Sequence, residues 1–129
     1  MTTWPALTVF AALPVRDVGA AEGFYAQLFG RAPDGKPSTG IVEWYLVDPD
    51  LPEKGTLQIR EDSERAGGGL ATINVGDMKA ASDAAAQLGL DFEVRVLPIQ
   101  AEAVEAVSVA EILDPDGNSL TVVQPHLRR

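Results

Sequence analysis

Two glutamates are the residues best suited to proton chemistry in this chain of 129 residues. Glu43 and Glu111 each lie in a segment that reads as a β-strand, and a carboxylate drawn into a pocket can act as a general base. A glutamate on a strand is more often a solvated side chain, so catalysis by these two residues is an alternative and not an assignment. The single histidine, His126, falls in a C-terminal segment that we expect to be a solvated, frayed tail.

Several catalytic chemistries are excluded or disfavoured by residue types that are missing or misplaced. The chain has no cysteine, which excludes disulfides, zinc–thiolate sites and thiol nucleophiles. No serine lies in a Gly-x-Ser-x-Gly elbow, so a Ser-His-Asp triad is not expected. The glycines at 67–69 precede a strand and not a helix, and we interpret them as a linker and not as a phosphate-binding loop.

Two further side chains are candidates for holding a ligand. Arg60 shares one face of a predicted strand with Gln58 and could bind the carboxylate of a ligand. An arginine exposed on the surface without a ligand is the commoner interpretation. Trp44 could form a stacking wall for a flat ligand, and packing in the core or in a dimer interface is an equal alternative.

Charge and composition limit the classes of partner. The net charge of −9 and the pI near 4.4 argue against nucleic acid, because phosphate binding needs clustered basic residues. An acidic surface is compatible with a cationic or neutral ligand but is also common for solubility. No run approaches the ~20 apolar residues of a spanning helix, and the first residues lack a basic, apolar leader. We therefore expect no membrane association and a cytoplasmic location.

The chain repeats itself with a period of 60 residues. Shifting Leu13–Asp17 by this period gives Ile73–Asp77, and Gln27-Leu28 becomes Gln87-Leu88. In both copies an apolar strand ends in an aspartate that can cap the alanine-rich helix after it. Two copies of one unit predict a paired module and not a solenoid.

Each half reads as strand, helix and three strands. Predicted strands in the first half cover 7–15, a short edge segment near 33–37, 41–47 and 56–60, with a helix that Gly30 ends. Predicted strands in the second half cover 70–75, 92–97, 103–113 and 119–123, with a helix that Gly89 ends and with Pro125 closing the last strand. We predict an α+β fold in which two βαβββ modules, 7–62 and 70–125, joined by a linker at 63–69, form a curved mixed sheet with a concave cleft.

Two motifs at opposite ends of the repeat resemble a known family. The first is Leu13–Asp17 followed by Phe24-Tyr25 and Leu28–Gly30, and the second is Asp114–Leu120, which begins with the turn sequence Asp-Pro-Asp-Gly. Together they resemble the vicinal oxygen chelate superfamily, which contains glyoxalase I, extradiol dioxygenases, and the bleomycin and fosfomycin resistance proteins. The resemblance covers about 7–124 and implies a glyoxalase/bleomycin resistance-like fold and a homodimer.

The resemblance also implies four metal-ligand positions. In register with Asp17 and Asp77, these positions carry Phe10, Gln58, Leu70 and Thr121. Phenylalanine and leucine offer no lone pair, whereas a divalent ion favours imidazole or carboxylate. We therefore expect a member of a metal-free subgroup with no cofactor; binding of a metal by carboxylates alone, through Glu61 or Glu111, is disfavoured.

These expectations lead to one leading hypothesis and two alternatives. The first is a metal-free protein that sequesters a small molecule in an apolar cleft, with no partner other than its ligand and a second copy of itself. The second is a glyoxalase-like lyase, isomerase or dioxygenase that works through Glu43 or Glu111. The third is a regulatory module that binds another protein. The expected ligand-binding residues are Phe10, Trp44, Gln58, Arg60, Leu70 and Thr121.

Overall fold

A computed structural model describes residue 5 and residues 8–47 and 54–128, and it has the predicted α+β architecture of two modules. The first module contains β1 (Phe10–Val15), α1 (Val18–Phe29), β2 (Gly35–Ser38), β3 (Ile41–Val47) and β4 (Lys54–Glu61). The second contains β5 (Leu70–Asn74), α2 (Met78–Gln87), β6 (Arg95–Pro98), β7 (Val104–Leu113) and β8 (Ser119–Leu127). Both modules therefore follow the order βαβββ.

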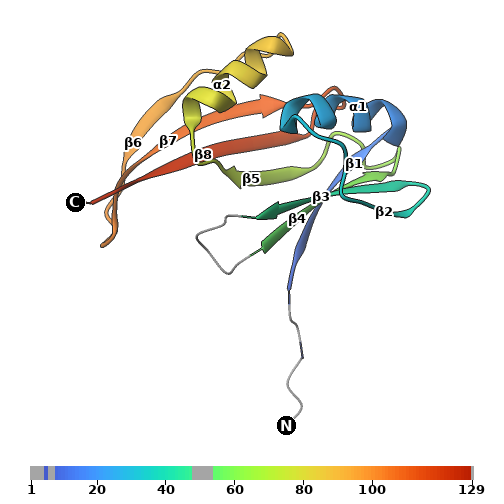
Figure 1. Cartoon of the computed structure of the whole chain (residues 1–129), viewed down its shortest axis with the longest axis horizontal. Helices are drawn as coiled ribbons and strands as arrows, with labels where there is room; N and C mark the ends of the chain where they lie inside the picture. The colour runs from blue at the N-terminus through green and yellow to red at the C-terminus, as the bar shows by residue number, and fades with distance from the viewer. Residues whose placement is uncertain (1–4, 6–7, 48–53, 129) are drawn as a thin grey trace.

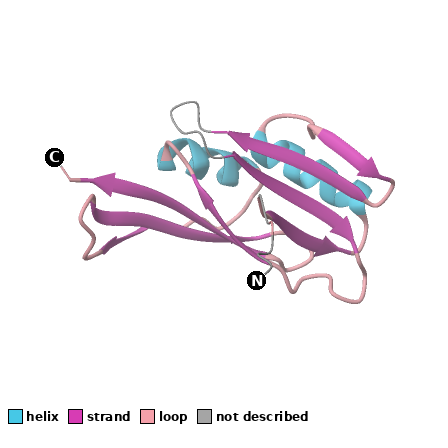
Figure 2. Ribbon diagram, turned by 90° about the horizontal axis from the view of Figure 1, so that it is seen from below, coloured by secondary structure: helices cyan, strands magenta, loops and turns pink. Residues whose placement is uncertain are grey.

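The strands form two mixed sheets with the same topology. The first sheet has the order β1-β4-β3-β2 and the second β5-β8-β7-β6. In each sheet the first and last strands of the module pair in parallel, and the other neighbours are antiparallel. Both helices lie on the same side of the strands (Figures 1 and 2). The two sheets are hydrogen-bonded separately and meet where β1 contacts β5.

The predicted aspartate caps begin both helices. The Asp17 carboxylate accepts hydrogen bonds from the amides of Gly19 and Ala20, at 2.8 and 3.2 Å. Asp77 repeats the arrangement on the first turn of α2, at 3.0 and 3.2 Å. These bonds satisfy amide groups that have no partner within the helix. Gly30 ends α1 in the left-handed conformation, with φ 72°, as predicted.

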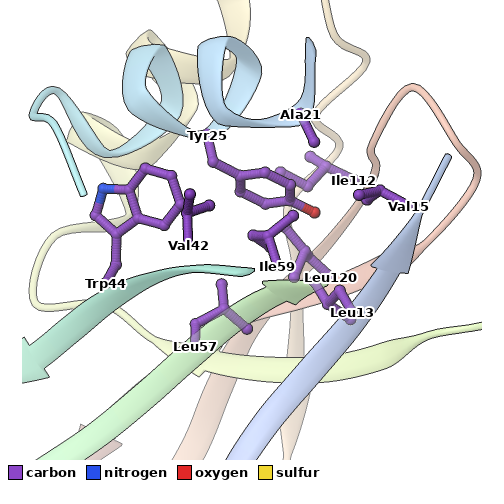
Figure 3. Packing of buried hydrophobic residues seen from close by; sticks show 10 residues of the cluster. All are labelled: Leu13, Val15, Ala21, Tyr25, Val42, Trp44, Leu57, Ile59, Ile112 and Leu120. Atoms are coloured by element: carbon purple, nitrogen blue, oxygen red, sulfur yellow. The ribbon is translucent and has the colours of Figure 1, made fainter. Parts of the chain in front are cut away.

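The core is centred on the helix-covered side of the first sheet. Leu13, Ile59, Tyr25 and Trp44 are completely buried there. Figure 3 shows these side chains converging beneath α1, together with two residues of the second sheet, Ile112 and Leu120. The ring centroids of Tyr25 and Trp44 lie 6.1 Å apart. One continuous core therefore joins the two modules.

The turn between β7 and β8 locks the second module onto β1. The buried Asn118 side chain donates to the Pro14 carbonyl at 2.7 Å and accepts from the Gly69 amide at 2.7 Å. The buried Tyr25 hydroxyl donates to the Asp114 carboxylate at 2.7 Å. The Gly67 amide also donates to the Pro14 carbonyl, at 3.3 Å. The linker is therefore fixed to the body of the protein.

The prediction that the last strand stops at Pro125 and that His126 is a frayed tail residue was wrong. β8 continues to Leu127 and pairs with the first half of β7. His126 lies opposite Ala106, and its Nε2 is 2.7 Å from the Ser108 hydroxyl. Pairing with β5 ends at Val123, so one side of β8 is an edge beyond that point, where a proline is tolerated.

Other differences from the expected elements are small. β6 begins at Arg95 instead of Phe92, because the half-buried Phe92 packs against the core and leaves the strand pattern. The predicted start of the first strand at Leu7 lies outside the described residues, as does most of the segment between the predicted strands 41–47 and 56–60. None of the helices in the described part of the chain is long and apolar enough to cross a membrane.

Candidate functional site

The sheet faces opposite α1 and α2, here called the helix-free faces, carry the four positions implied by the family resemblance. On β1, Leu13 and Val15 are buried beneath α1, so the alternation of a strand places Phe10 on the other face. Phe10 lies opposite Thr56, and Gln58 lies opposite Glu43. Phe10, Gln58 and Glu43 therefore share the helix-free face of the first sheet.

The second sheet repeats this alternation. Leu120 and Val122 are buried on the helix side of β8, which places Thr121 on the helix-free face. Glu111 lies opposite Thr121 across the β7–β8 pair. Leu70 lies opposite Ser119 and so shares the face with both.

Phe10 and Leu70 present hydrocarbon to the surface on these faces. Phe10 is 50% exposed and Leu70 is 82% exposed. A large apolar side chain exposed in isolation is common, but here the two residues occupy positions related by the internal repeat. The helix-free face of each sheet therefore has an apolar contact point at the start of its first strand.

A partly buried polar pair lies on the helix-free face of the first sheet. The Gln58 amide nitrogen donates a short hydrogen bond to Oε2 of Glu43, whose side chain is only 7% exposed. A carboxylate held in this way can accept a hydrogen bond from a ligand or take up a proton. Of the two carboxylates considered from the sequence, Glu43 is held by a neighbour, whereas Glu111 is exposed.

Sequence reasoning missed Tyr45 as a member of this site. Tyr45 is two residues from Glu43 on the same strand, so both side chains lie on the helix-free face. A methyl group added to Gly35 would lie 2.6 Å from the Tyr45 hydroxyl and 3.4 Å from Oε1 of Glu43. Gly35 therefore gives these polar groups room to approach the backbone of β2. The i, i+2 spacing of Glu43 and Tyr45 was the available signal.

Trp44 and Arg60 lie on opposite faces of the first sheet. Trp44 is fully buried against α1, and its indole nitrogen donates to the Arg31 carbonyl at 3.1 Å. Core packing, the second interpretation considered for Trp44, describes its position. Arg60 is exposed and lies on the face of Gln58, as its alternation in the sequence predicts.

Within one chain the four implied positions fall into two separate groups. The second module meets β1 at its C-terminal half, because a Cβ on Gly69 would lie 2.7 Å from Leu13 and 2.9 Å from Pro14. Phe10 is at the other end of β1, about 13 Å from Pro14 at the usual rise of a strand. Leu70 follows Gly69 directly. Phe10 and Gln58 therefore form one group, and Leu70 and Thr121 form the other.

The side chains at these positions do not fit the divalent metal that the family resemblance implies. Phe10 and Leu70 have no donor atom, which leaves only the neutral amide oxygen of Gln58 and the hydroxyl of Thr121 at the four positions. Among residues 5, 8–47 and 54–128, no group of three or more His, Cys, Asp or Glu side chains could hold a metal ion. Divalent ions at protein sites are held by several imidazole or carboxylate donors.

Tyr25 is a permanent hydrogen-bond donor on the helix side of the sheet. Burial and the hydrogen bond to Asp114 raise the pKa of its hydroxyl far above the ordinary value. The phenol therefore stays protonated in the folded protein. Its part is structural, because it joins α1 to the β7–β8 turn and not to the helix-free faces.

Comparison with solved structures confirms the fold. The chain is similar to a glyoxalase/bleomycin resistance protein from Catenulispora acidiphila, with 27% identity over 92% of this chain and 98% of that one, and a TM-score of 0.70. A bleomycin-binding protein complexed with bleomycin is 19% identical over 94% of this chain and all of the other, with a TM-score of 0.62. Lactoylglutathione lyase from Agrobacterium tumefaciens is 19% identical over 94% of this chain and 96% of the other, with a TM-score of 0.63.

No protein-family model matches the chain, and no curated protein sequence matches it. The solved structures show that the chain has a glyoxalase/bleomycin resistance-like fold and structural similarity to that superfamily.

Proposed function

We propose that this protein binds a small organic molecule on its helix-free faces, without a metal ion and without making or breaking a bond. The observation that carries the proposal is the exposed hydrocarbon of Phe10 and Leu70. The internal repeat relates these two positions, and the family resemblance implies that metalloenzymes place metal-binding side chains there.

The helix-free face of the first sheet combines the two features of a ligand site. Phe10 supplies apolar surface, and burying such surface contributes roughly 25 cal/mol per Å². Glu43, Gln58 and Tyr45 supply a few polar groups that can fix the orientation of the ligand. The Glu43 carboxylate favours a ligand with a hydrogen-bond donor or a positive charge.

A second copy of the chain is part of this proposal. Phe10 and Leu70 are both exposed and are separated within one chain, so each helix-free face is half of an apolar site. A two-fold dimer that sets the first sheet of one protomer against the second sheet of its partner would form two equivalent sites. Small-molecule binding also agrees with the structural similarity to a protein solved with bleomycin.

The proposal is tested by titrating the protein with Nile red, a neutral apolar dye. Leu70→Glu places a charge in the proposed site, and Val96→Glu places the same charge at an exposed aliphatic residue, 63% accessible, on the helix side of the second sheet. We expect Leu70→Glu to weaken dye binding by about tenfold or more, because burial of a leucine contributes about 1.5–3 kcal/mol, and Val96→Glu to leave it unchanged. Equal effects of the two substitutions would contradict the proposal.

A second candidate function is catalysis by Glu43. Its burial beside Gln58 on a helix-free face favours this over catalysis by the exposed Glu111, and one similar structure is a lactoylglutathione lyase. Turnover of a 2-oxoaldehyde–thiol adduct that is lost in Glu43→Gln and kept in Glu111→Gln would favour the enzyme. No turnover by the wild-type protein would leave binding as the function.

A further inference from the structure

A hollow of about 670 Å³ lies on the helix side of the second sheet, lined by the last turn of α1, by α2 and by residues of β5, β7 and β8. This volume falls within the range of roughly 300–1,000 Å³ that is typical of small-molecule sites. We propose that the hollow is a second binding site, selective for a hydrophobic organic cation, and that it is independent of the helix-free faces.

The hollow exists because α2 lacks the aromatic side chains of α1. Under the 60-residue repeat, Phe24 and Tyr25 of α1 correspond to Ala84 and Ala85 of α2. Tyr25 fills the space above the first sheet and is fully buried. Ala84 and Ala85 line the hollow instead, so the equivalent space above the second sheet stays open.

The floor and walls of the hollow are apolar. The second sheet contributes four aliphatic side chains, and α1 and the segment before β6 contribute three more. These residues are Ile73, Ile112, Leu120, Val122, Leu28, Phe29 and Phe92. Ile112, Leu120 and Val122 are buried, so the apolar surface that a ligand can cover comes mainly from the partly buried Ile73, Leu28, Phe29 and Phe92. Such a surface favours a ligand with a hydrophobic body, because packing the body there removes this surface from water.

The electrostatics of the rim favour positive charge. The last turn of α1 lines the hollow, and the carbonyl end of a helix carries partial negative charge. The structure describes this turn in full, and it holds no basic side chain. Asp83 also lines the hollow, and the charge of the lining residue Asp77 offsets the positive amide end of α2 that it caps. No Lys, Arg or His is among the lining residues, all of which are described.

Neighbouring charges leave this balance negative. Lys79 offsets part of the Asp83 charge through an exposed ion pair of 3.2 Å, which is the weak kind of pair. Asp91 and Glu93 flank the lining residue Phe92 and are both exposed. A cation with an apolar body therefore matches the hollow in both surface and charge.

Two ions of the same shape and opposite charge test the proposal. Tetraphenylphosphonium is a hydrophobic cation, and tetraphenylborate is its anionic counterpart. In calorimetric titrations of the intact protein we expect the phosphonium to bind with one site per chain and the borate to bind about tenfold more weakly or less. Equal binding of the two ions, or binding of neither, would overturn the proposal.

A matched pair of substitutions on α2 locates the site. Ala84→Phe restores the bulk that Phe24 has in the first module, and Ala86→Phe adds the same ring at an exposed position outside the hollow. We expect Ala84→Phe to abolish phosphonium binding and Ala86→Phe to leave it unchanged. The two variants have the same net charge, so equal loss in both would show non-specific attraction and overturn the proposal.

A third variant and a size measurement complete the test. Asp83→Asn removes a rim charge at an exposed position and should weaken phosphonium binding a few fold without changing borate binding. Unchanged phosphonium affinity in this variant would contradict the charge argument. This outcome can be read even if Ala84→Phe fails to fold. If Ala84→Phe alone changes the oligomeric state in size-exclusion chromatography, the hollow is covered by a second copy and the proposal is wrong. Dye binding to Leu70→Glu reports on the other site separately.

Discussion

The two modules have the same topology and the same aspartate caps at their helix starts, yet they differ in how tightly their helix sides are packed. The first module buries Tyr25 and Trp44 completely beneath α1. The second module sets alanines of α2 above its sheet and leaves a hollow of about 670 Å³. Strand pattern and capping set the order of elements, whereas side-chain volume decides whether the space between them is filled.

Truncating the largest core side chain should reveal the difference in packing between the two modules most strongly. Trp44→Ala should lower the free energy of unfolding by about 3–5 kcal/mol, because its cavity would open in the densest part of the core. Met78→Ala, which truncates a buried residue of α2, should cost only about 2 kcal/mol. Urea unfolding at pH 7 measures both, and a larger loss for Met78→Ala would break the comparison.

Substitutions at two glycines compare the stability cost of a change at the junction between the modules with that of a change inside the second module. Gly67 has φ 86°, and a Cβ there would lie 2.3 Å from the Asp116 carbonyl oxygen. Gly67→Ala should therefore cost about 3 kcal/mol of stability. Gly89 has φ 71° but open space around it, so Gly89→Ala should cost only about 1 kcal/mol. Similar unfolding midpoints in urea for the two variants would show that the turn does not fix the junction.

Filling the hollow should stabilise the second module. Ala84→Leu adds apolar surface that can pack against the floor of the hollow, and we expect a gain of about 1 kcal/mol in the free energy of unfolding. Ala86→Leu is the control on the solvent side of the same helix and should change stability by less than about 0.5 kcal/mol. Thermal unfolding compares them. A destabilised Ala84→Leu would indicate that the space is already filled.

The smallest effect is a pH dependence in the first module. The amide of Tyr45 and the guanidinium of Arg31 hold the pKa of Asp34 below its ordinary value of 3.8. A depressed pKa stabilises the fold above pH 3.8, and this contribution is lost as the pH falls through the lower, folded-state pKa. Asp34→Asn should therefore be less stable than wild type in urea at pH 7 and should approach it near pH 2. A constant difference at both pH values would contradict this cause.

The sequence contained enough information for the fold because its signals are local and repeated. Asp17 and Asp77 mark equivalent helix starts, and the turn at Asp114–Gly117 marks the last hairpin. The extension of β8 past Pro125 could not be predicted, since it depends on a partner strand distant in sequence. A proline is a stop signal only where both sides of a strand are paired.

The candidate site was predictable only in part. Alternation placed Gln58 and Arg60 on one face, and the family resemblance added Phe10. Neither could decide which face of β3 the helix covers and hence that Trp44 is buried. The hollow beneath α2 was present in the sequence as Ala84 and Ala85 opposite the repeat positions of Phe24 and Tyr25. Only the structure shows that no other side chain among the lining residues fills that space.

The central claim, that hydrocarbon replaces metal donors on the helix-free faces, is tested most directly by a metal-binding measurement. The purified protein is dialysed against zinc, nickel, manganese and iron(II) salts in turn, passed through a desalting column and analysed for bound metal. We predict that no ion is retained in stoichiometric amount, because Phe10 and Leu70 provide no donor atoms. One tightly held ion per chain that is lost in Gln58→Ala would contradict this account.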